Sequence, residues 1–185
     1  PPLVRALLAI AILFVEARTF VADRTAFWPA ALLVMLALPA IATSQFFLGY
    51  PLRVLVGVAS SWILRLYGFA VVRDGVLLSW GEENFSVDAP CSGVRMLWAA
   101  AVLVLFLAGH WRLPWRRTVA LAAGAGTAVI SANVVRAVLF FLAEKSSVNL
   151  DGWRHDAAGG IVFALAVTAI VIGGMLLKRK TLCEA

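Results

Sequence analysis

Long apolar runs separated by short clusters of charge dominate this 185-residue sequence. Hydrophobic residues make up 63% of the chain and charged residues only 14%, whereas soluble domains are about half apolar and a quarter charged. A run of roughly 18 or more apolar residues can cross the bilayer core as a helix. The composition therefore excludes an ordinary soluble fold. The recognisable runs are residues 3–15, 27–50, 52–72, 92–108, 118–142 and 159–177.

These runs predict an all-α, polytopic transmembrane bundle of about six spans, forming a single integral membrane domain over residues 1–185. Because further runs follow residues 3–15, we expect an uncleaved first helix rather than a signal peptide. The one distinctly polar stretch, residues 73–90, contains two short strand-like segments, 75–80 and 85–87, around a turn at 81–84. This pattern predicts a small outer hairpin before the fourth span.

The distribution of Lys and Arg indicates how the chain faces the membrane. The net charge of +6 comes from residues that flank apolar runs, which is typical of anchors at anionic lipid headgroups and not of a nucleic-acid-binding patch. The tail at 178–180 and the loop between the fourth and fifth spans lie two spans apart, so they share a side, which the positive-inside rule makes cytoplasmic. We also expect Arg5 and Arg53 on that side. The arginines of that loop are Arg112, Arg116 and Arg117. The chain is therefore predicted to be a multi-pass protein of the cytoplasmic membrane with its C-terminus on the cytoplasmic side.

Cys91 is the most informative residue on the predicted outer side. Pro90 ends the extended segment before it, and Cys91 or Ser92 can cap the helix that follows. A thiol at a helix N-terminus lies beside unpaired N–H groups, which favour the thiolate. Arg95 lies one turn further on the same face and adds positive charge. The alternative is an inert cysteine that fills space between helices.

A second candidate is Arg136, which lies inside an apolar run with Asn133 one turn before it. A charged side chain in that position costs about 2.5–3.5 kcal/mol on insertion scales. Intramembrane charges usually face a polar cavity, so this position indicates function. Two structural alternatives stay open: Arg136 reaches the outer headgroups, or it pairs with a carboxylate such as Glu144.

His155 is the only histidine on the predicted outer side. A thiol nucleophile needs a base that later protonates the leaving amine, and a histidine can serve. An arginine can stabilise the oxyanion that acyl transfer generates. Cys91, Arg136 and His155 are thus a sufficient set for cysteine acyl transfer. The sequence contains no zinc motif, P-loop or dinucleotide fingerprint, so we predict neither a metal nor a cofactor.

Three segments together resemble the exosortase/archaeosortase family. They are Ala-Pro-Cys-Ser-Gly-Val-Arg at 89–95, Asn-Val-Val-Arg at 133–136 and His-Asp-Ala-Ala-Gly at 155–159. The resemblance covers approximately residues 75–177, and the first three spans match only as hydrophobic helices. Proline at position 90 departs from the family pattern, where residues at neighbouring positions vary.

The resemblance implies a membrane-embedded cysteine protease or transpeptidase that processes secreted, membrane-tethered proteins at the outer face of the membrane. Its substrates would carry a C-terminal sorting signal: a short motif, a transmembrane helix and a basic tail. Cys91 would be the nucleophile, Arg136 the ligand of the oxyanion and His155 the acid and base, through an acyl-enzyme. The supporting residues would be Ser92, Gly93, Arg95, Asn133 and Gly159.

Two other classes of function remain open from the sequence. One is a small transporter or channel component, in which Arg65, Arg95 and Arg136 line an anion path. The other is a non-catalytic membrane assembly subunit, supported by the small residues of the fifth run between positions 120 and 128. Those small residues permit close helix packing, either within the chain or against a substrate helix.

Overall fold

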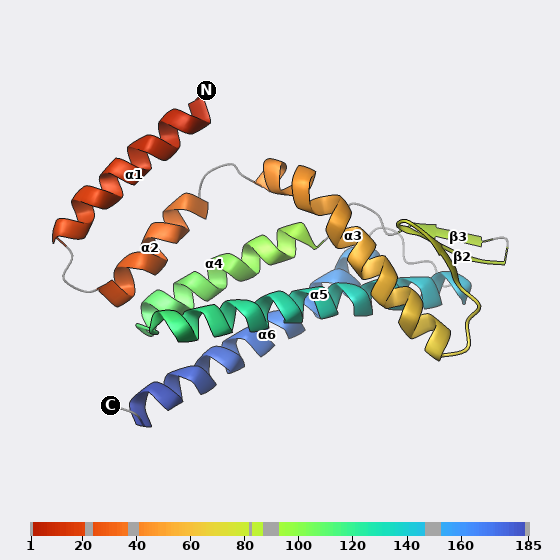
Figure 1. The fold of residues 1–185 in the computed structure, drawn as a ribbon. Coiled ribbons are helices and arrows are strands. Elements are labelled where there is room, and N and C mark those ends of the chain that lie inside the picture. The colour runs from red at the N-terminus through yellow and green to blue at the C-terminus, as the bar shows by residue number, and fades with distance from the viewer. Residues whose placement is uncertain are drawn as a thin grey trace.

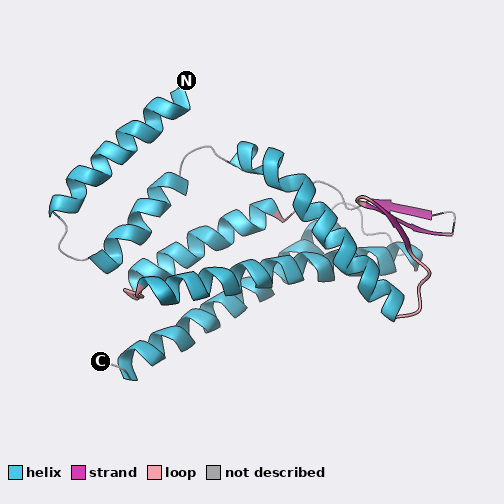
Figure 2. Cartoon of the chain, viewed as in Figure 1, coloured by secondary structure: helices cyan, strands magenta, loops and turns pink. Residues whose placement is uncertain are grey.

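The computed structural model describes residues 2–20, 24–36, 41–81, 83–86, 93–146 and 153–183. These ranges form six helices and three short strands (Figure 2). In chain order they are α1 Pro2–Phe20, α2 Arg24–Leu36, α3 Ile41–Leu66, β1 Val72–Asp74, β2 Leu77–Trp80, β3 Glu83–Ser86, α4 Val94–His110, α5 Trp115–Lys145 and α6 Trp153–Cys183.

The centre of the molecule is α5, which packs against α3, α4 and α6 (Figure 1). Apolar residues at helical spacing on α5, such as Leu121 and Val129, are buried against Val104 of α4 and Ile170 of α6. α2 packs on α4, and α1 packs on α2, where Phe14 meets Phe27 edge to face at 5.9 Å. The N-terminal helices are therefore attached to the bundle at its periphery.

A tight turn joins α4 to α5 at one end of the bundle. The N–H of Leu113 donates to the carbonyl of Ala108 at 2.9 Å, and the N–H of Arg112 donates to that of Gly109 at 3.2 Å. This pair of bonds is a Schellman motif, which places Arg112 in the left-handed region with φ 50°. The end of α6 lies beside this turn, because the Lys178 ammonium is 5.7 Å from the Trp111 ring centroid. The basic residues of the turn and of the α6 terminus thus lie at the same end of the bundle.

At the opposite end, α3 crosses the bundle and leads into the strands (Figure 1). Val56 and Leu64 of α3 are buried against the second half of α5, around Phe140. The helix ends with Gly68 in the left-handed region, φ 86°. The N–H of Phe69 then donates to the carbonyl of Leu64 at 3.1 Å, which closes a second Schellman motif.

The three strands form one antiparallel sheet in the order β1-β2-β3. β2 and β3 are joined through Gly81, and β1, which the sequence patterns did not predict, adds a third strand next to β2. The sheet docks on the end of α5 through aromatic rings: Phe141 meets Phe69 at 5.9 Å and Phe85 at 6.2 Å. The Lys145 ammonium lies 4.2 Å from the Phe69 ring centroid and closes this cluster.

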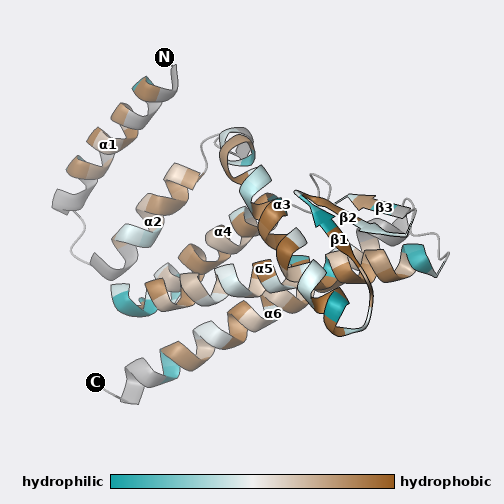
Figure 3. Ribbon diagram, turned by 45° about the vertical axis from the view of Figure 1, so that its right-hand side comes forward, coloured by the Kyte–Doolittle hydropathy of each residue, from teal (hydrophilic) through white to brown (hydrophobic). Residues whose placement is uncertain are grey.

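Three helices of the described residues are long and apolar enough to cross a membrane: Thr43–Leu66 within α3, α5, and Ala157–Arg179 within α6. Large apolar side chains are exposed along the outer faces of the helices, and Figure 3 shows apolar residues running along most of their length. Such faces are expected in contact with lipid hydrocarbon. The described part of the chain therefore has six helices, of which three reach spanning length, while Phe27–Leu36 and α4 are shorter apolar helices.

The boundary between the predicted second and third spans was wrong. The sequence runs suggested helices over 27–50 and 52–72, divided at Pro51, but α3 runs from Ile41 to Leu66 with Pro51 inside it. Proline removes one helical hydrogen bond and usually interrupts a helix. Here the packing of Val56 and Leu64 on α5 favours a continuous α3, and the Arg53 guanidinium donates to the Gly49 carbonyl at 3.3 Å beside the proline.

The expected placement of Arg53 was wrong as well. A Cβ added to Gly75, in the β1–β2 turn, would lie 3.7 Å from the Tyr50 hydroxyl, so this part of α3 lies at the sheet end of the bundle. Conversely, the start of α2 lies at the other end, where Pro29 is 3.5 Å from the position of a Cβ on Gly109. In this part of the chain α3 crosses α5 at an angle instead of running along it (Figure 1).

The docking of the sheet on α5 generates a first prediction. Phe141→Ala removes a side chain that is 5% exposed and is expected to lower the free energy of unfolding by about 3 kcal/mol. It should also speed amide hydrogen exchange in β2 and β3. Thermal unfolding in detergent and exchange followed by mass spectrometry measure both effects.

The matched control is Leu139→Ala, since Leu139 is on the same helix but 47% exposed. Equal destabilisation by the two variants would contradict the role assigned to Phe141.

Candidate active site

The start of α4 is held against α5 by a glycine. Gly93 is the N-cap of α4 and lies in the left-handed region with φ 71°. A Cβ built on Gly93 would clash with the Asn133 side chain, coming within 2.9 Å of its Cγ. Glycine is thus required twice here, for the backbone conformation and for the close approach of α4 to α5.

Asn133 is one of the most deeply buried polar residues of the bundle, with 2% of its surface exposed. Its side-chain amide donates to the Val129 carbonyl at 2.9 Å, one turn earlier on α5. Its Oδ1 atom is buried and has no hydrogen-bond partner among the described residues. A buried acceptor without a partner is costly, typically about 1–3 kcal/mol. The Oδ1 atom of Asn133 is therefore an acceptor, close to the Gly93 backbone, that could accept a further hydrogen bond.

Arg136 follows Asn133 by one turn and is 6% exposed. Its guanidinium carbon lies 5.2 Å from the Phe140 ring centroid and 3.2 Å from the position that a Cβ on Gly159 would occupy. α6 therefore approaches closely because residue 159 has no side chain. The Nε atom of Arg136 is buried without a hydrogen-bond partner in the described part of the chain. The expected alternative of a side chain extended to the headgroups does not fit this burial.

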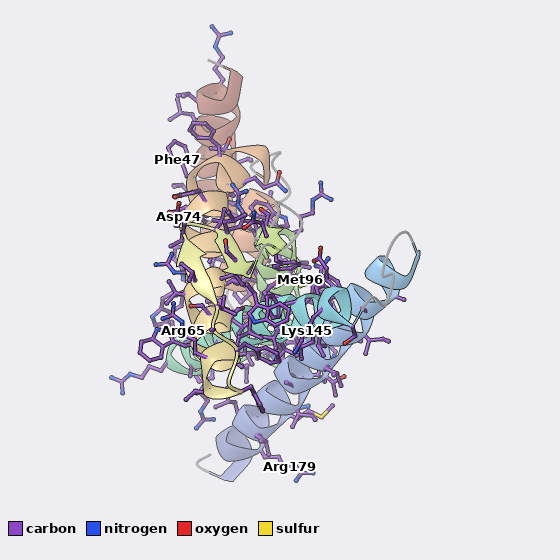
Figure 4. The ribbon with its side chains drawn as sticks, turned by 90° about the vertical axis from the view of Figure 1, so that its right-hand side faces the viewer. Phe47, Arg65, Asp74, Met96, Lys145 and Arg179 are labelled. Atoms are coloured by element: carbon purple, nitrogen blue, oxygen red, sulfur yellow. The ribbon has the colours of Figure 1, made fainter. Side chains whose placement is uncertain are left out.

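A cavity of about 310 Å³ opens in front of the Arg136 guanidinium. It lies between α4, α5 and α6, and Figure 4 views the molecule from the sheet end, with Met96 of the cavity labelled. Its lining combines two arginines with apolar side chains and bare backbone: Arg95, Met96, Ala99, Arg136, Gly159, Gly160 and Phe163. A cavity between helices with few, convergent polar groups is typical of a small binding site.

The structure thus brings together five of the eight residues predicted for the site. Arg95, Arg136 and Gly159 line the cavity, and Gly93 meets Asn133 directly beside it. Cys91 and Ser92 lie outside the described residues. His155 belongs to α6, one turn before Gly159 on the same helical face, and its side chain is not described.

Sequence reasoning missed the apolar part of the lining. Met96, Ala99 and Phe163 are ordinary residues of apolar helices, so no motif distinguishes them from lipid-facing or core positions. Gly160 carried a weak signal, because it forms a Gly-Gly pair with Gly159 in a helix. The second histidine, His110, is at the far end of α4 and stacks on Phe106, with 5.9 Å between ring centroids.

Gly93 generates the second prediction. Gly93→Ala is expected to lower the free energy of unfolding by more than the roughly 1–2 kcal/mol that a left-handed conformation alone costs, because the new methyl also displaces Asn133. Gly81→Ala is the matched control: Gly81 has φ 62°, but a Cβ there meets nothing within 4 Å. Thermal unfolding of both variants measures the difference, and equal losses would contradict the close contact with Asn133.

Comparison with known proteins supports the resemblance found in the motifs. The family model for transmembrane exosortases (Exosortase_EpsH) matches residues 2–172, and so extends over α1 to α3 as well as over the site. No curated protein and no solved structure matches the chain significantly. The chain is a multi-pass membrane protein, and the extent of the match shows that it belongs to the transmembrane exosortase family.

Proposed function

We propose that this protein is a membrane-embedded cysteine protease or transpeptidase. It cleaves C-terminal sorting signals from secreted, membrane-tethered proteins at the outer face of the cytoplasmic membrane. The observation that carries the proposal is the buried Arg136 guanidinium, with an unpartnered Nε, facing a cavity between α4, α5 and α6. Family membership supports the reaction class.

Chain connectivity supports Cys91 as the nucleophile of this site. Cys91 precedes Gly93 by two residues, and two peptide units span at most about 7 Å between Cα atoms. Gly93 in turn touches Asn133, which is one turn from Arg136. This short connection in the sequence supports the assignment of Cys91 to the site.

The position of His155 supports its role as acid and base. It lies one turn before Gly159, where an added Cβ would come within 3.2 Å of the Arg136 guanidinium carbon. Residues four apart on a helix share a face. Position 155 is therefore on the side of α6 that faces Arg136, towards the end at which α4 begins.

The proposed reaction begins when His155 takes the proton of the Cys91 thiol. The sulfur forms a bond to the scissile carbonyl carbon, and the carbonyl electron pair moves to the oxygen, whose charge Arg136 stabilises. Collapse of this intermediate breaks the C–N bond, and His155 delivers its proton to the leaving amine. The acyl group on Cys91 then passes to water or to an acceptor amine, which restores the thiol.

The arrangement of charge supports the proposed orientation. The basic residues of the α4–α5 turn and of the α6 terminus gather at the end of the bundle opposite the cavity: Arg112, Arg116, Arg117, Lys178 and Arg179. The positive-inside rule makes that end cytoplasmic. The cavity and the sheet then lie at the outer face, where a secreted domain emerges from its own transmembrane helix.

The anion-path alternative receives no support from the positions of the arginines. Arg95 and Arg136 line the cavity, but the Arg65 side chain donates to the Val71 carbonyl at 2.9 Å, at the end of α3. The non-catalytic assembly alternative gives no reason for a buried arginine that lines a cavity and whose Nε has no partner among the described residues. We therefore retain the enzyme proposal alone.

The third prediction concerns Cys91. In cells that carry only the Cys91→Ala variant, uncleaved membrane-tethered precursors are expected to accumulate, because no other group can form the acyl-enzyme. Mass spectrometry of membrane fractions, quantifying peptides that cross the cleavage point, measures the accumulation.

Cys183→Ala, which removes the other cysteine, is the control and should mature its precursors normally. Normal maturation in the Cys91→Ala cells, with the variant present at wild-type abundance, would refute the proposed function.

The fourth prediction distinguishes the role of the Arg136 hydrogen-bond donors from that of its positive charge. Arg136→Lys keeps a cation but loses the planar set of N–H donors, and is expected to slow precursor cleavage by about 10²–10³-fold. Pulse-chase labelling of a precursor that accumulates in the Cys91→Ala cells measures the rate.

Arg65→Lys is the matched control, because it also removes an Nε donor, here the one bound to Val71, at a position away from the cavity. Its cleavage rate should stay near that of the wild type. A similar loss of rate in both variants would instead favour the arginine-lined path.

A further inference from the structure

We propose that the substrate's transmembrane segment reaches Arg136 from within the bilayer, through the side of the cavity between α4 and α6, and that Gly160 keeps this route open. The inference rests on the proposed function and adds the docking surface for the substrate. The occupant is an apolar, membrane-spanning polypeptide segment. The extended chain that precedes its helix presents carbonyl oxygens to the arginines.

The two glycines of α6 have different roles in this geometry. A Cβ on Gly159 would lie 3.2 Å from the Arg136 guanidinium carbon, so this position is occupied by Arg136. A Cβ on Gly160 would meet nothing within 4 Å, although Gly160 lines the same cavity. Across the cavity, α4 contributes the exposed Ala99. Ala99 and the two glycines therefore leave room on both sides of the space between α4 and α6, beside the larger Met96 and Phe163 of the same lining.

The surroundings of this opening are apolar. Beyond the cavity, α6 exposes 64% of Ile161 and 65% of Leu165, and α4 exposes 38% of Val102, about one turn beyond Ala99. Exposed large apolar side chains on helices of a membrane protein are suited to hydrocarbon and not to water. These exposed apolar faces suit lipid hydrocarbon, so an apolar, membrane-resident segment is the occupant that best matches the opening.

The interior of the cavity selects for an occupant with hydrogen-bond acceptors. Arg95 and Arg136 are the charged side chains that the structure describes in its lining, and none of the described lining residues is acidic. The Nε of Arg136 has no partner among the described residues, although the residue is only 6% exposed. A lipid acyl chain offers no acceptor, whereas the extended segment next to a substrate helix offers a row of carbonyls.

The α6 surface next to the opening suits a helical occupant. Ala164 follows Gly160 by one turn and is exposed, so a small residue repeats at a spacing of four. Such positions let two membrane helices approach closely. A substrate helix packed there would place its outer end beside Arg136 and the start of α4.

A large side chain at position 160 tests whether the substrate segment enters between α4 and α6. Gly160→Leu is expected to slow maturation of the precursors that accumulate in Cys91→Ala cells at least about tenfold, by misplacing the scissile bond. Gly124→Leu, on α5, is the matched control, because Gly124 is an exposed helical glycine whose added Cβ also meets nothing within 4 Å. It should mature precursors at the wild-type rate. Wild-type rates for Gly160→Leu at normal abundance would overturn the inference.

A disulfide test gives a positive signal that misfolding cannot produce. In the inactive Cys91→Ala, Cys183→Ala background, Gly160→Cys should cross-link under mild oxidation to a single cysteine placed in the transmembrane segment of an accumulated precursor. Gly124→Cys should not. Absence of a cross-link at 160, or equal cross-linking at both positions, overturns the route while precursor accumulation still supports the enzyme. If Cys91→Ala accumulates no precursor, the proposed function itself fails, and the inference fails with it.

Discussion

The burial of one guanidinium among apolar helices is the constraint on which the cavity end of this bundle depends. Placing a charge at membrane depth costs about 2.5–3.5 kcal/mol on insertion scales, so Arg136 must be enclosed by groups that tolerate it. The Phe140 ring contributes a cation–π contact at 5.2 Å, and α6 approaches closely because residue 159 is glycine. The packing of α5 against α6 at this level is therefore determined by the space that Arg136 occupies.

The start of α4 is fixed by the same part of α5. Asn133 lies one turn from Arg136 and fills the space that a side chain on Gly93 would need. A short sequence on α5 thus positions both neighbouring helices. The sheet reinforces this end from outside, because Phe141, on the last turns of α5, packs against Phe69 and Phe85. The start of α4, the Gly159 region of α6 and the sheet are consequently all packed on one helix, α5. This suits a site that must hold reacting groups in fixed geometry.

The sequence was most informative where a chemical requirement coincides with helical spacing. Asn133 and Arg136 are one turn apart in an apolar run, and Gly93 and Arg95 follow the cysteine within one turn, so their proximity to a common site could be predicted. The apolar lining could not, because Met96 and Phe163 resemble any residue of a membrane helix. The course of α3 could not either: proline usually ends a helix, yet α3 continues through Pro51 and packs Val56 and Leu64 on α5.

The turn between α4 and α5 places a charged residue in a backbone conformation that is unfavourable for it. Arg112 adopts a left-handed conformation, φ 50°, at the position where glycine is the usual residue. An L-amino acid pays roughly 1–2 kcal/mol for that geometry. In the orientation proposed above, an arginine at this position adds a positive charge that would resist translocation of the turn. The consequence is that the residue which strains this hairpin is also one of the charges that would direct its insertion: a glycine at position 112 would relax the turn and remove that charge.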